Sequence, residues 1–205
     1  NKLFQYLDLV TIAIAADIVP VSGENRILAY HGLNQLQNTE RHGIRAMLYN
    51  AGFKKDQLTI TDVVFLLAPR INAAGRIFSG KKAVDLLLSQ NPEEAATAAA
   101  AIEEFNTTRK TLDKGITEEA LQKIDEDAFY QSALSAVVYG ENWHKGVVGI
   151  VAARIVETHY KPSIVLVSDG EKMAGSARSI AGIDLFECLS ECEDLLEQFG
   201  GHTMA

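Results

Sequence analysis

Residues 133–180 decide the fold class, because short apolar runs alternate there with one longer segment. The runs are 133-ALSAVVYG-140, 162-PSIVLVS-168 and 172-KMAGSARSI-180, and the longer segment is 146-GVVGIVAARIVETH-159. Short runs of this kind predict strands, and the longer segment predicts a helix that starts at glycine. A further helix is predicted over residues 184–199. This alternation predicts a small α/β domain from about residue 130 onward.

The preceding part of the chain is predicted to be mostly helical. Its longest pattern runs from Asn91 to about Ile124, with Pro92 at a first-turn position and an alanine-rich start that favours helix. We predict that this helix joins two domains. Shorter helices are predicted over 3–16, 25–37 and 80–89 and in a segment that ends at Gly52, whereas 59–67 fits either a strand or a helix.

The composition is that of a soluble globular protein. Of 205 residues, 47% are apolar and 22% charged, and the apolar runs are too short to span a membrane. No signal peptide is visible, and the chain neither begins with Met nor ends in a tail, so we expect a piece of a longer protein. Cys188 and Cys192 are predicted to be reduced thiols, buried or half-buried, which favours a cytoplasmic location.

The net charge of −8 argues against binding of nucleic acid over the whole surface. Cations nevertheless cluster in 69-PRINAAGRIFSGKK-82, which also contains the spacing G-x-x-x-x-G-K. Lys82 stands where a phosphate-binding loop of nucleotide hydrolases needs Ser or Thr, and a loop-like segment replaces the buried strand that should precede it. The match to a nucleotide-binding loop is therefore interpreted as accidental. That these cations form a local basic groove remains an open alternative.

Asp17, which closes an apolar helix in AIAADIVP, has two readings. It is either an N-cap for the segment that follows or a metal ligand, and spacing alone favours the cap. Metal-catalysed phosphodiester hydrolysis needs several Asp and His ligands, and no second cluster exists here to join Asp17. Any partner ligands are therefore expected outside these residues.

Three loops of the predicted α/β domain suit a phosphate group. His144 precedes a helix opened by glycine, whose free N–H groups favour an anion. Ser176 and Arg178 offer a hydroxyl and a guanidinium in GSARS. In the turn Gly200-Gly201-His202, two glycines let the backbone approach a ligand. Each loop alone is ordinary, but together they indicate contact with a nucleic-acid backbone.

These segments together resemble the RecJ family of single-strand-specific exonucleases, within the DHH phosphoesterase superfamily. The blocks that carry the resemblance are 7-LDLVTIAIAADIVPVSGENRIL-28, 68-APRINAAGR-76, 141-ENWHKGVVGIVAARI-155, 175-GSARSI-180 and 199-FGGHTMA-205. They occur in order and span the whole chain.

The resemblance implies a fold and an activity. Residues 1–90 would be the end of an α/β DHH catalytic domain, 91–127 a long connecting helix, and 128–205 most of a small α/β DHH-associated domain. Family members degrade single-stranded DNA from the 5′ end with Mn²⁺ or Mg²⁺, in DNA repair and recombination. The partners implied are single-stranded DNA and a helicase or single-strand-binding protein, with no membrane.

The resemblance also implies residue roles. Asp17 matches the last metal-binding carboxylate of the catalytic domain, which reverses the preference for a cap. Arg70, Asn72 and Arg76 match a loop that faces the substrate. The DNA-binding groove of the second domain would include His144, Ser176, Arg178, Gly200, Gly201 and His202.

The sequence departs from the family pattern in lacking the DxD and DHH motifs, which supply most metal ligands. We therefore expect these residues to have little or no nuclease activity by themselves. Two alternatives remain open at this stage. The chain could be a non-catalytic single-strand-binding module, or part of a superfamily hydrolase of short oligoribonucleotides or cyclic dinucleotides.

Overall fold

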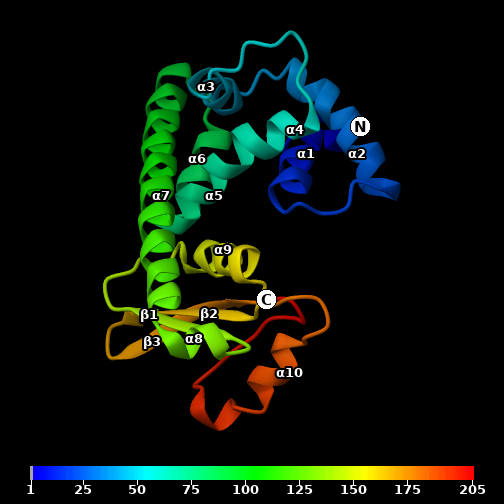
Figure 1. Cartoon of the computed structure of the whole chain (residues 1–205). Coiled ribbons are helices and arrows are strands. Elements are labelled where there is room, and N and C mark those ends of the chain that lie inside the picture. Colours follow the sequence, from blue (N-terminus) through cyan, green and yellow to red (C-terminus); the bar gives the residue numbers. More distant parts are fainter. Residues whose placement is uncertain (1) are drawn as a thin grey trace. The chain divides into compact units, whose positions relative to one another are not determined.

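The structure is a computed structural model that describes residues 2–205, and it divides into two compact units (Figure 1). Unit 1 comprises Asn1–Arg109 and unit 2 comprises Lys110–Ala205. The boundary falls within the long helix α7 (Pro92–Glu126), so each unit contains part of that helix. The predicted mixture of helices and a small sheet is confirmed. None of the described helices has the length and apolar character of a membrane span.

All the regular secondary structure in the described residues of unit 1 is helical, and turns and loops join the helices. Its core contains Ile12, Leu36 and Met47 together with Leu86 and Ile102, all nearly inaccessible to solvent. Ile102 lies on α7, so the first half of that helix packs into the core and is more than a spacer. The elements before α7 are η1 (Lys2–Tyr6), α1 (Leu7–Ala16), α2 (Gly23–Gln37), α3 (His42–Asn50), α4 (Ile60–Asp62), the π-helical η2 (Val63–Leu67), α5 (Ala68–Ile77) and α6 (Lys81–Leu88).

The segment PRINAAGR was predicted to be a loop, and this prediction is wrong. It forms α5, in which Pro69 occupies the first turn, where a missing N–H costs no hydrogen bond. Ala73 and Ala74 are fully buried and hold the helix against the core. The preceding η2 is a π-helix in which the Ala68 N–H donates to the Val63 carbonyl, five residues back. Residues 59–67, left open between strand and helix, are thus helical from Ile60 onward.

A capping box begins this helical run. The Thr59 side chain accepts from the Asp62 N–H, and the Asp62 carboxylate accepts from the Thr59 N–H at 3.0 Å. Lys55 Nζ lies 2.6 Å from the same carboxylate, which is largely buried. Hydrogen bonds from Lys55 and Thr59 lower the pKa of Asp62 from 3.8 to about 2.

We expect Asp62 to contribute to stability in proportion to its ionisation. Its pKa is lower in the folded state, so the contribution is complete above about pH 4 and is lost as the pH falls toward 2. Asp62→Asn should therefore cost about 1–2 kcal/mol at neutral pH and progressively less below pH 4. Thermal unfolding of both proteins at several pH values measures this, with Asp56→Asn, an exposed neighbour, as control. An equal gap between wild type and Asp62→Asn at all pH values would contradict the assignment.

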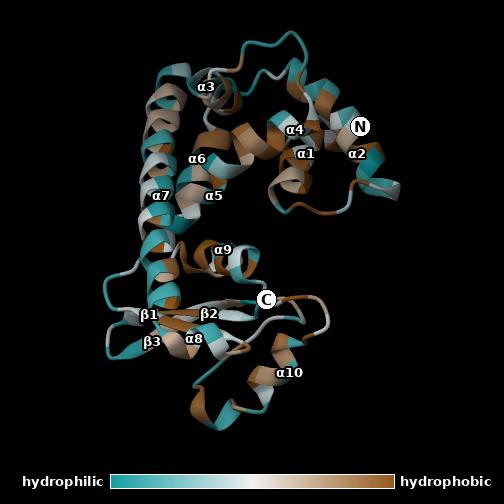
Figure 2. Ribbon diagram, in the orientation of Figure 1, coloured by the Kyte–Doolittle hydropathy of each residue, from teal (hydrophilic) through white to brown (hydrophobic). Residues whose placement is uncertain are grey.

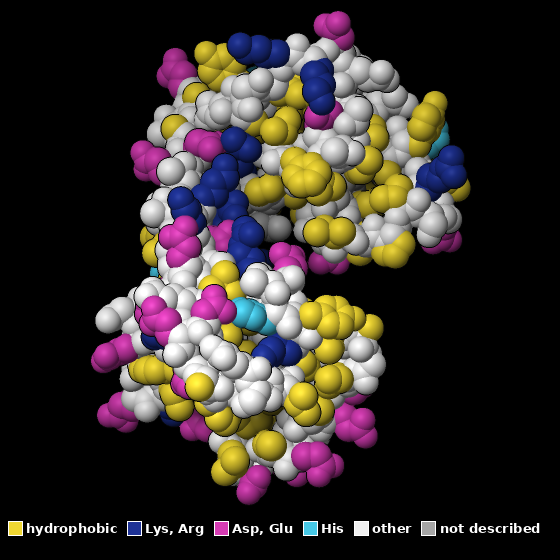
Figure 3. Space-filling model, in the orientation of Figure 1, with side chains coloured by type: hydrophobic (Ala, Val, Ile, Leu, Met, Phe, Trp, Pro, Cys, Tyr) yellow, Lys and Arg dark blue, Asp and Glu magenta, His cyan; other side chains and the backbone are white. Residues whose placement is uncertain are grey.

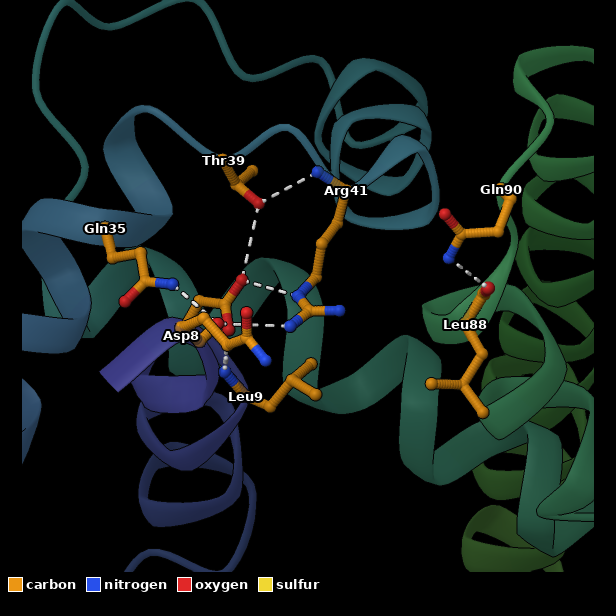
Figure 4. Close-up of polar contacts among 8 residues, drawn as sticks. Asp8, Leu9, Gln35, Thr39, Arg41, Leu88 and Gln90 are labelled. Atoms are coloured by element: carbon orange, nitrogen blue, oxygen red, sulfur yellow. Dashed lines mark hydrogen bonds and ion pairs between the residues drawn. The ribbon is translucent and has the colours of Figure 1, made fainter. Parts of the chain in front are cut away.

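A buried ion pair joins α1 to the segment before α3. Asp8 is 2% exposed, and its Oδ2 accepts from Arg41 Nε at 2.7 Å, while Oδ1 accepts from the Leu9 N–H (Figure 4). Arg41 also donates to the Gln5 carbonyl at 3.2 Å. These contacts connect α1 with the turn before α3, which lie more than 30 positions apart in the sequence.

Unit 2 is built on a three-stranded sheet in the order β1 (Ala136–Gly140), β2 (Ser163–Asp169), β3 (Lys172–Arg178). β1 and β2 are parallel and joined by α9 (Val148–His159), whereas β2 and β3 are antiparallel. The largely apolar α9 (Figure 2) buries Val151 and Ile155 and packs against β2 and β3. These strands and this helix confirm the pattern that decided the fold class. The remaining elements are α8 (Ala128–Ser132), α10 (Leu185–Ser190) and η3 (Glu193–Leu195).

The helix predicted over residues 184–199 is much shorter in the structure, so this prediction is wrong in extent. Asp184 caps α10 by accepting from the Glu187 N–H, but the helix ends at Ser190. The residues beyond are rich in Asp and Glu, and negative charge at a helix C-terminus is unfavourable. Cys188 and Cys192 are both exposed free thiols, which contradicts their predicted burial.

Candidate nucleic-acid interface

The first turn of α9 lies directly against β3. A Cβ added to Gly149 would lie 3.0 Å from Ser176 Oγ and 3.4 Å from Arg178 Nη2, so only glycine gives this closeness without adjustment. Ser176 and Arg178 are two residues apart on a strand and therefore point to the same face, the face that α9 covers. The first N–H groups of any helix lack partners within it, and Val147 supplies no side-chain cap.

Arg178 is held in place by its own strand. Its Nη1 donates to Ser176 Oγ at 3.2 Å and to the Ala177 carbonyl at 2.6 Å. The side chain is half-buried, so few of its rotamers are accessible. A guanidinium held beside a hydroxyl and a helix N-terminus is suited to a phosphate oxygen.

His144 belongs to the turn that leads into α9. Its Nδ1 accepts from the Gly146 N–H at 3.1 Å, and its carbonyl accepts from the Val147 N–H at 3.1 Å. The ring is half-buried. With Nδ1 used as acceptor, the neutral ring carries its proton on Nε2, which leaves Nε2 as the donor.

The C-terminal turn lies beside the end of β3. The Ser179 N–H donates to the Met204 carbonyl at 3.0 Å, and the Leu185 N–H donates to the Thr203 carbonyl at 2.9 Å. His202 and Ala205 exchange two backbone hydrogen bonds, and a Cβ on Gly201 would lie 2.2 Å from the Ala205 carbonyl oxygen. The tight turn therefore requires glycine at 201. It brings the Gly200-Gly201-His202 segment to the same end of β3 as Arg178.

Asp184 fixes this turn from the other side. Its Oδ2 accepts from Thr203 Oγ1 at 2.8 Å. The Glu187 N–H, and after it the Thr203 hydroxyl, lower the pKa of Asp184. The carboxylate thus favours its charged form and accepts hydrogen bonds from the first turn of α10 and from Thr203. The first turn of α9 and the C-terminal turn therefore both lie at the end of β3 that carries Arg178, and His144 belongs to the turn that leads into α9. Figure 3 shows a histidine beside a basic side chain on one face of this unit.

The residues predicted in PRINAAGR lie on α5 of unit 1, where they differ in exposure. Arg70 is buried, and two of its guanidinium nitrogens have partners within unit 1: Nε lies 2.5 Å from Glu103 Oε2, and Nη1 donates to the Leu66 carbonyl at 2.7 Å. Asn72 and Arg76 are exposed. In the structure Arg70 holds α5 to α7. Arg76 is exposed on the same helix, and Figure 3 shows basic side chains gathered on the surface of this unit.

Asp17 lies at the C-terminal end of α1, not at the start of a helix. Its N–H donates to the Ala13 carbonyl, and its side chain is exposed, so the N-cap reading is wrong. Asn72 Nδ2 lies 3.5 Å from the carbonyl of Ala16, which places both predicted residues at the same end of α1. Ile18 follows with a φ of 53°, a strained value for a β-branched residue. Such strain is concentrated at functional sites.

The described residues do not form a complete metal site. Among residues 2–205, no three His, Cys, Asp or Glu side chains are grouped so as to hold an ion. Mg²⁺ requires about six oxygen ligands in octahedral geometry, and Asp17 can supply one carboxylate. The donor set present here does not fit a catalytic metal without further ligands.

Aromatic side chains do not form a stacking platform at this site. Trp143 is only 6% exposed, and Phe186 lies against Phe199 with ring centroids 5.5 Å apart. Tyr160 is exposed but lies at the far end of α9. The arrangement is therefore suited to backbone phosphates and not to stacked bases.

Sequence reasoning missed the contacts that support the site. Trp143 Nε1 donates to Glu119 Oε2 at 2.8 Å across 24 positions of sequence, and no local pattern indicates that pairing. Gly149 was noted as part of a glycine-opened helix, but its proximity to Ser176 depends on how α9 crosses β3. The one available signal was the glycine at position 149, because a close crossing of helix and strand requires a small residue.

Comparison with known proteins identifies first the domain and then the family. Residues 130–205 match the family model of the DHHA1 domain. The chain is 43% identical over 203 residues to the single-stranded-DNA-specific exonuclease RecJ of Bacillus subtilis, covering 98% of the chain and 26% of that relative. It is 36% identical to the Escherichia coli RecJ over 212 residues, covering 100% of the chain and 37% of that relative.

A solved structure shows the same fold. The crystal structure of Thermus thermophilus RecJ in complex with Mg²⁺ superposes with a TM-score of 0.87 at 32% identity, covering 98% of the chain and 31% of that protein. Over almost its whole length, the chain is therefore similar to one part of the RecJ-family exonucleases. It corresponds to 26–37% of the length of the two sequence relatives.

Proposed function

We propose that the chain is part of a single-stranded-DNA-specific exonuclease, which degrades DNA from the 5′ end with Mn²⁺ or Mg²⁺ in DNA repair and recombination. Similarity to RecJ exonucleases over almost the whole chain supports the reaction class. The boundaries 1–90, 91–127 and 128–205 are proposed for the catalytic part, connecting helix and DHH-associated domain. A cytoplasmic location and a helicase or single-strand-binding protein as partner belong to the same proposal.

Unit 2 is proposed to hold the sugar-phosphate backbone of the substrate strand. The observation that carries this proposal is the meeting of the first turn of α9 with Ser176 and Arg178, beside the turn containing His202. Fixed N–H groups and a guanidinium provide a site for an anion that needs no base contact. Because phosphates are common to all sequences, binding should not depend on base identity.

In unit 1, Asp17 is proposed to supply one carboxylate to the metal site, with the other ligands outside these 205 residues. Asn72 and Arg76 are proposed to face the substrate, and Arg70 to contribute by holding α5 in place through Glu103. When bound, a divalent metal would stabilise negative charge on the reacting phosphate. The strain at Ile18, next to Asp17, supports a functional role for this end of α1.

The test is equilibrium binding of the chain to fluorescently labelled single-stranded and duplex DNA, at about 50 and 200 mM salt. We expect tighter binding to the single strand and a steep loss with salt, since each neutralised phosphate releases a counterion. With Mn²⁺ added, the labelled strand should remain intact. Absence of binding at either salt concentration, or rapid degradation by the chain itself, would contradict the proposal.

A second function is favoured by the incomplete metal site. The described residues could act as a non-catalytic single-strand-binding module. They bring together the first turn of α9, Ser176 and Arg178, which we propose to bind the backbone, but they hold no group of metal-ligating side chains. A third function, a hydrolase of short oligoribonucleotides or cyclic dinucleotides, can be distinguished from these two by how binding affinity depends on the length of the strand. Affinity that rises with strand length favours the exonuclease or the binding module, whereas tightest binding to dinucleotides favours the hydrolase.

A further inference from the structure

The turn that carries His144 is held by α7 through a buried tryptophan. Trp143 Nε1 donates to Glu119 Oε2 at 2.8 Å, and Lys123 Nζ lies 4.8 Å from the centroid of the indole ring. Lys123 Nζ also lies 3.1 Å from Glu119 Oε1 and donates to the Tyr139 carbonyl of β1 at 3.0 Å. Glu119 and Lys123 thus bind each other, the indole and β1 at once.

The other side of the indole is fixed by β1. A Cβ on Gly140 would lie 2.1 Å from Trp143 Cδ2 and 2.2 Å from Cε2, so the ring rests on glycine backbone. An indole N–H buried without an acceptor costs free energy, and Glu119 supplies that acceptor. The Gly140 backbone and the hydrogen bond to Glu119 therefore fix one orientation of the ring.

The residues after Trp143 transmit this orientation to the phosphate site. His144 accepts from the Gly146 N–H, and Val147, which is fully buried, is the residue immediately before α9. Gly149, two residues further on, lies where an added Cβ would be 3.0 Å from Ser176 Oγ and 3.4 Å from Arg178 Nη2. Gly149 is only six positions after Trp143, and the Gly146 and Val147 N–H groups between them donate to His144.

We propose that Glu119 and Lys123 are positioning residues for the phosphate site of unit 2, acting through Trp143 on His144 and the first turn of α9. This inference rests on the proposed binding of single-stranded DNA. Neither side chain contacts the nucleic acid in this account. The negative charge of Glu119 by itself weakens binding of a polyanion, whereas its hydrogen bond to the indole strengthens binding by positioning the site. The two effects on affinity are therefore opposite in sign.

The test compares Glu119→Ala with Glu118→Ala, its exposed neighbour, whose pair with Lys114 is a long 3.9 Å. Both substitutions remove one negative charge, which by charge alone strengthens binding to DNA. We expect Glu118→Ala to bind single-stranded DNA as tightly as wild type or slightly more tightly. Glu119→Ala should instead bind about tenfold more weakly, because the charged hydrogen bond that fixes the indole is lost.

Two further variants separate positioning from general destabilisation. Glu119→Gln keeps an acceptor oxygen for the indole and should restore most of the affinity. Trp143→Phe keeps the aromatic ring but removes the N–H, and should weaken binding as Glu119→Ala does. Trp143 is the only tryptophan of the chain, so its fluorescence also reports the indole environment in each Glu119 variant.

The outcomes are distinct. Equal affinities of Glu119→Ala and Glu118→Ala would overturn the inference while leaving the proposed function intact. A loss in Glu119→Gln as large as that in Glu119→Ala would also overturn it, since the hydrogen bond would not be what matters. Failure of the wild-type chain to bind any single strand would instead refute the proposed function, and the inference with it.

Discussion

Gly32→Ala is expected to destabilise unit 1 by about 3 kcal/mol or more, at the upper end of overpacking substitutions. Gly32 is buried in α2 where that helix crosses α1. A Cβ there would lie 1.9 Å from Thr11 Oγ1 and 2.2 Å from the Leu7 carbonyl oxygen. The second atom is backbone and cannot rotate away, so α1 and α2 must move apart.

Gly115→Ala is the matched control for this substitution. Gly115 is exposed on α7, and no heavy atom lies within 4 Å of the position its Cβ would occupy. Alanine in an exposed helix interior is favoured over glycine by about 1 kcal/mol, so this variant should be more stable than wild type. Unfolding in urea followed by far-ultraviolet circular dichroism measures both. Stability of Gly32→Ala within about 0.5 kcal/mol of wild type would contradict the packing of α1 on α2.

Arg178→Ala is expected to have the largest effect on binding among single charge removals in unit 2. Its guanidinium is fixed by Ser176 and the Ala177 carbonyl and lies against the first turn of α9. Little side-chain entropy remains to be lost when it binds a phosphate. We expect affinity for single-stranded DNA to fall about tenfold or more, and the salt dependence to lose about one unit of slope.

Lys172→Ala controls for the loss of one positive charge. Lys172 lies at the other end of the same strand, is exposed, and pairs with Glu197 at 2.7 Å. Its removal should change affinity for single-stranded DNA less than about twofold. An exposed charge at the opposite end of β3 from Arg178 is screened by salt from the phosphate site. Equal losses for Arg178→Ala and Lys172→Ala would mean that binding follows net charge alone and that β3 carries no specific phosphate site.

The fold of unit 2 was predictable because its strands and helix have different periods. The sequence predicts strands at Val137 and Val138 and in the run PSIVLVS, and it predicts a helix at α9. None of these predictions needs tertiary information. α5 was missed because Pro69, Asn72 and Gly75 are typical of loops. Burial of Ala73 and Ala74 overrides those local preferences, and burial cannot be read from spacing alone.

The candidate site was predictable in its parts but not in its assembly. His144, Arg178 and His202 were each singled out from local chemistry or from the resemblance. Their meeting depends on the antiparallel return of β3, which places Arg178 opposite Ser163, and on the Ser179–Met204 hydrogen bond. The Glu119–Trp143 contact has no sequence signal, because neither residue type is unusual where it stands.

The most direct test of the central claim is nuclear magnetic resonance of the ¹⁵N-labelled chain titrated with a short single-stranded oligonucleotide. If unit 2 binds the phosphate backbone as proposed, the backbone amide signals that move should be those of Gly149, Ser176 and Arg178, with His202 and its neighbours. The same signals should move with oligonucleotides of different base sequence. Binding that shifts other amides of unit 2 and leaves these unchanged would contradict the account.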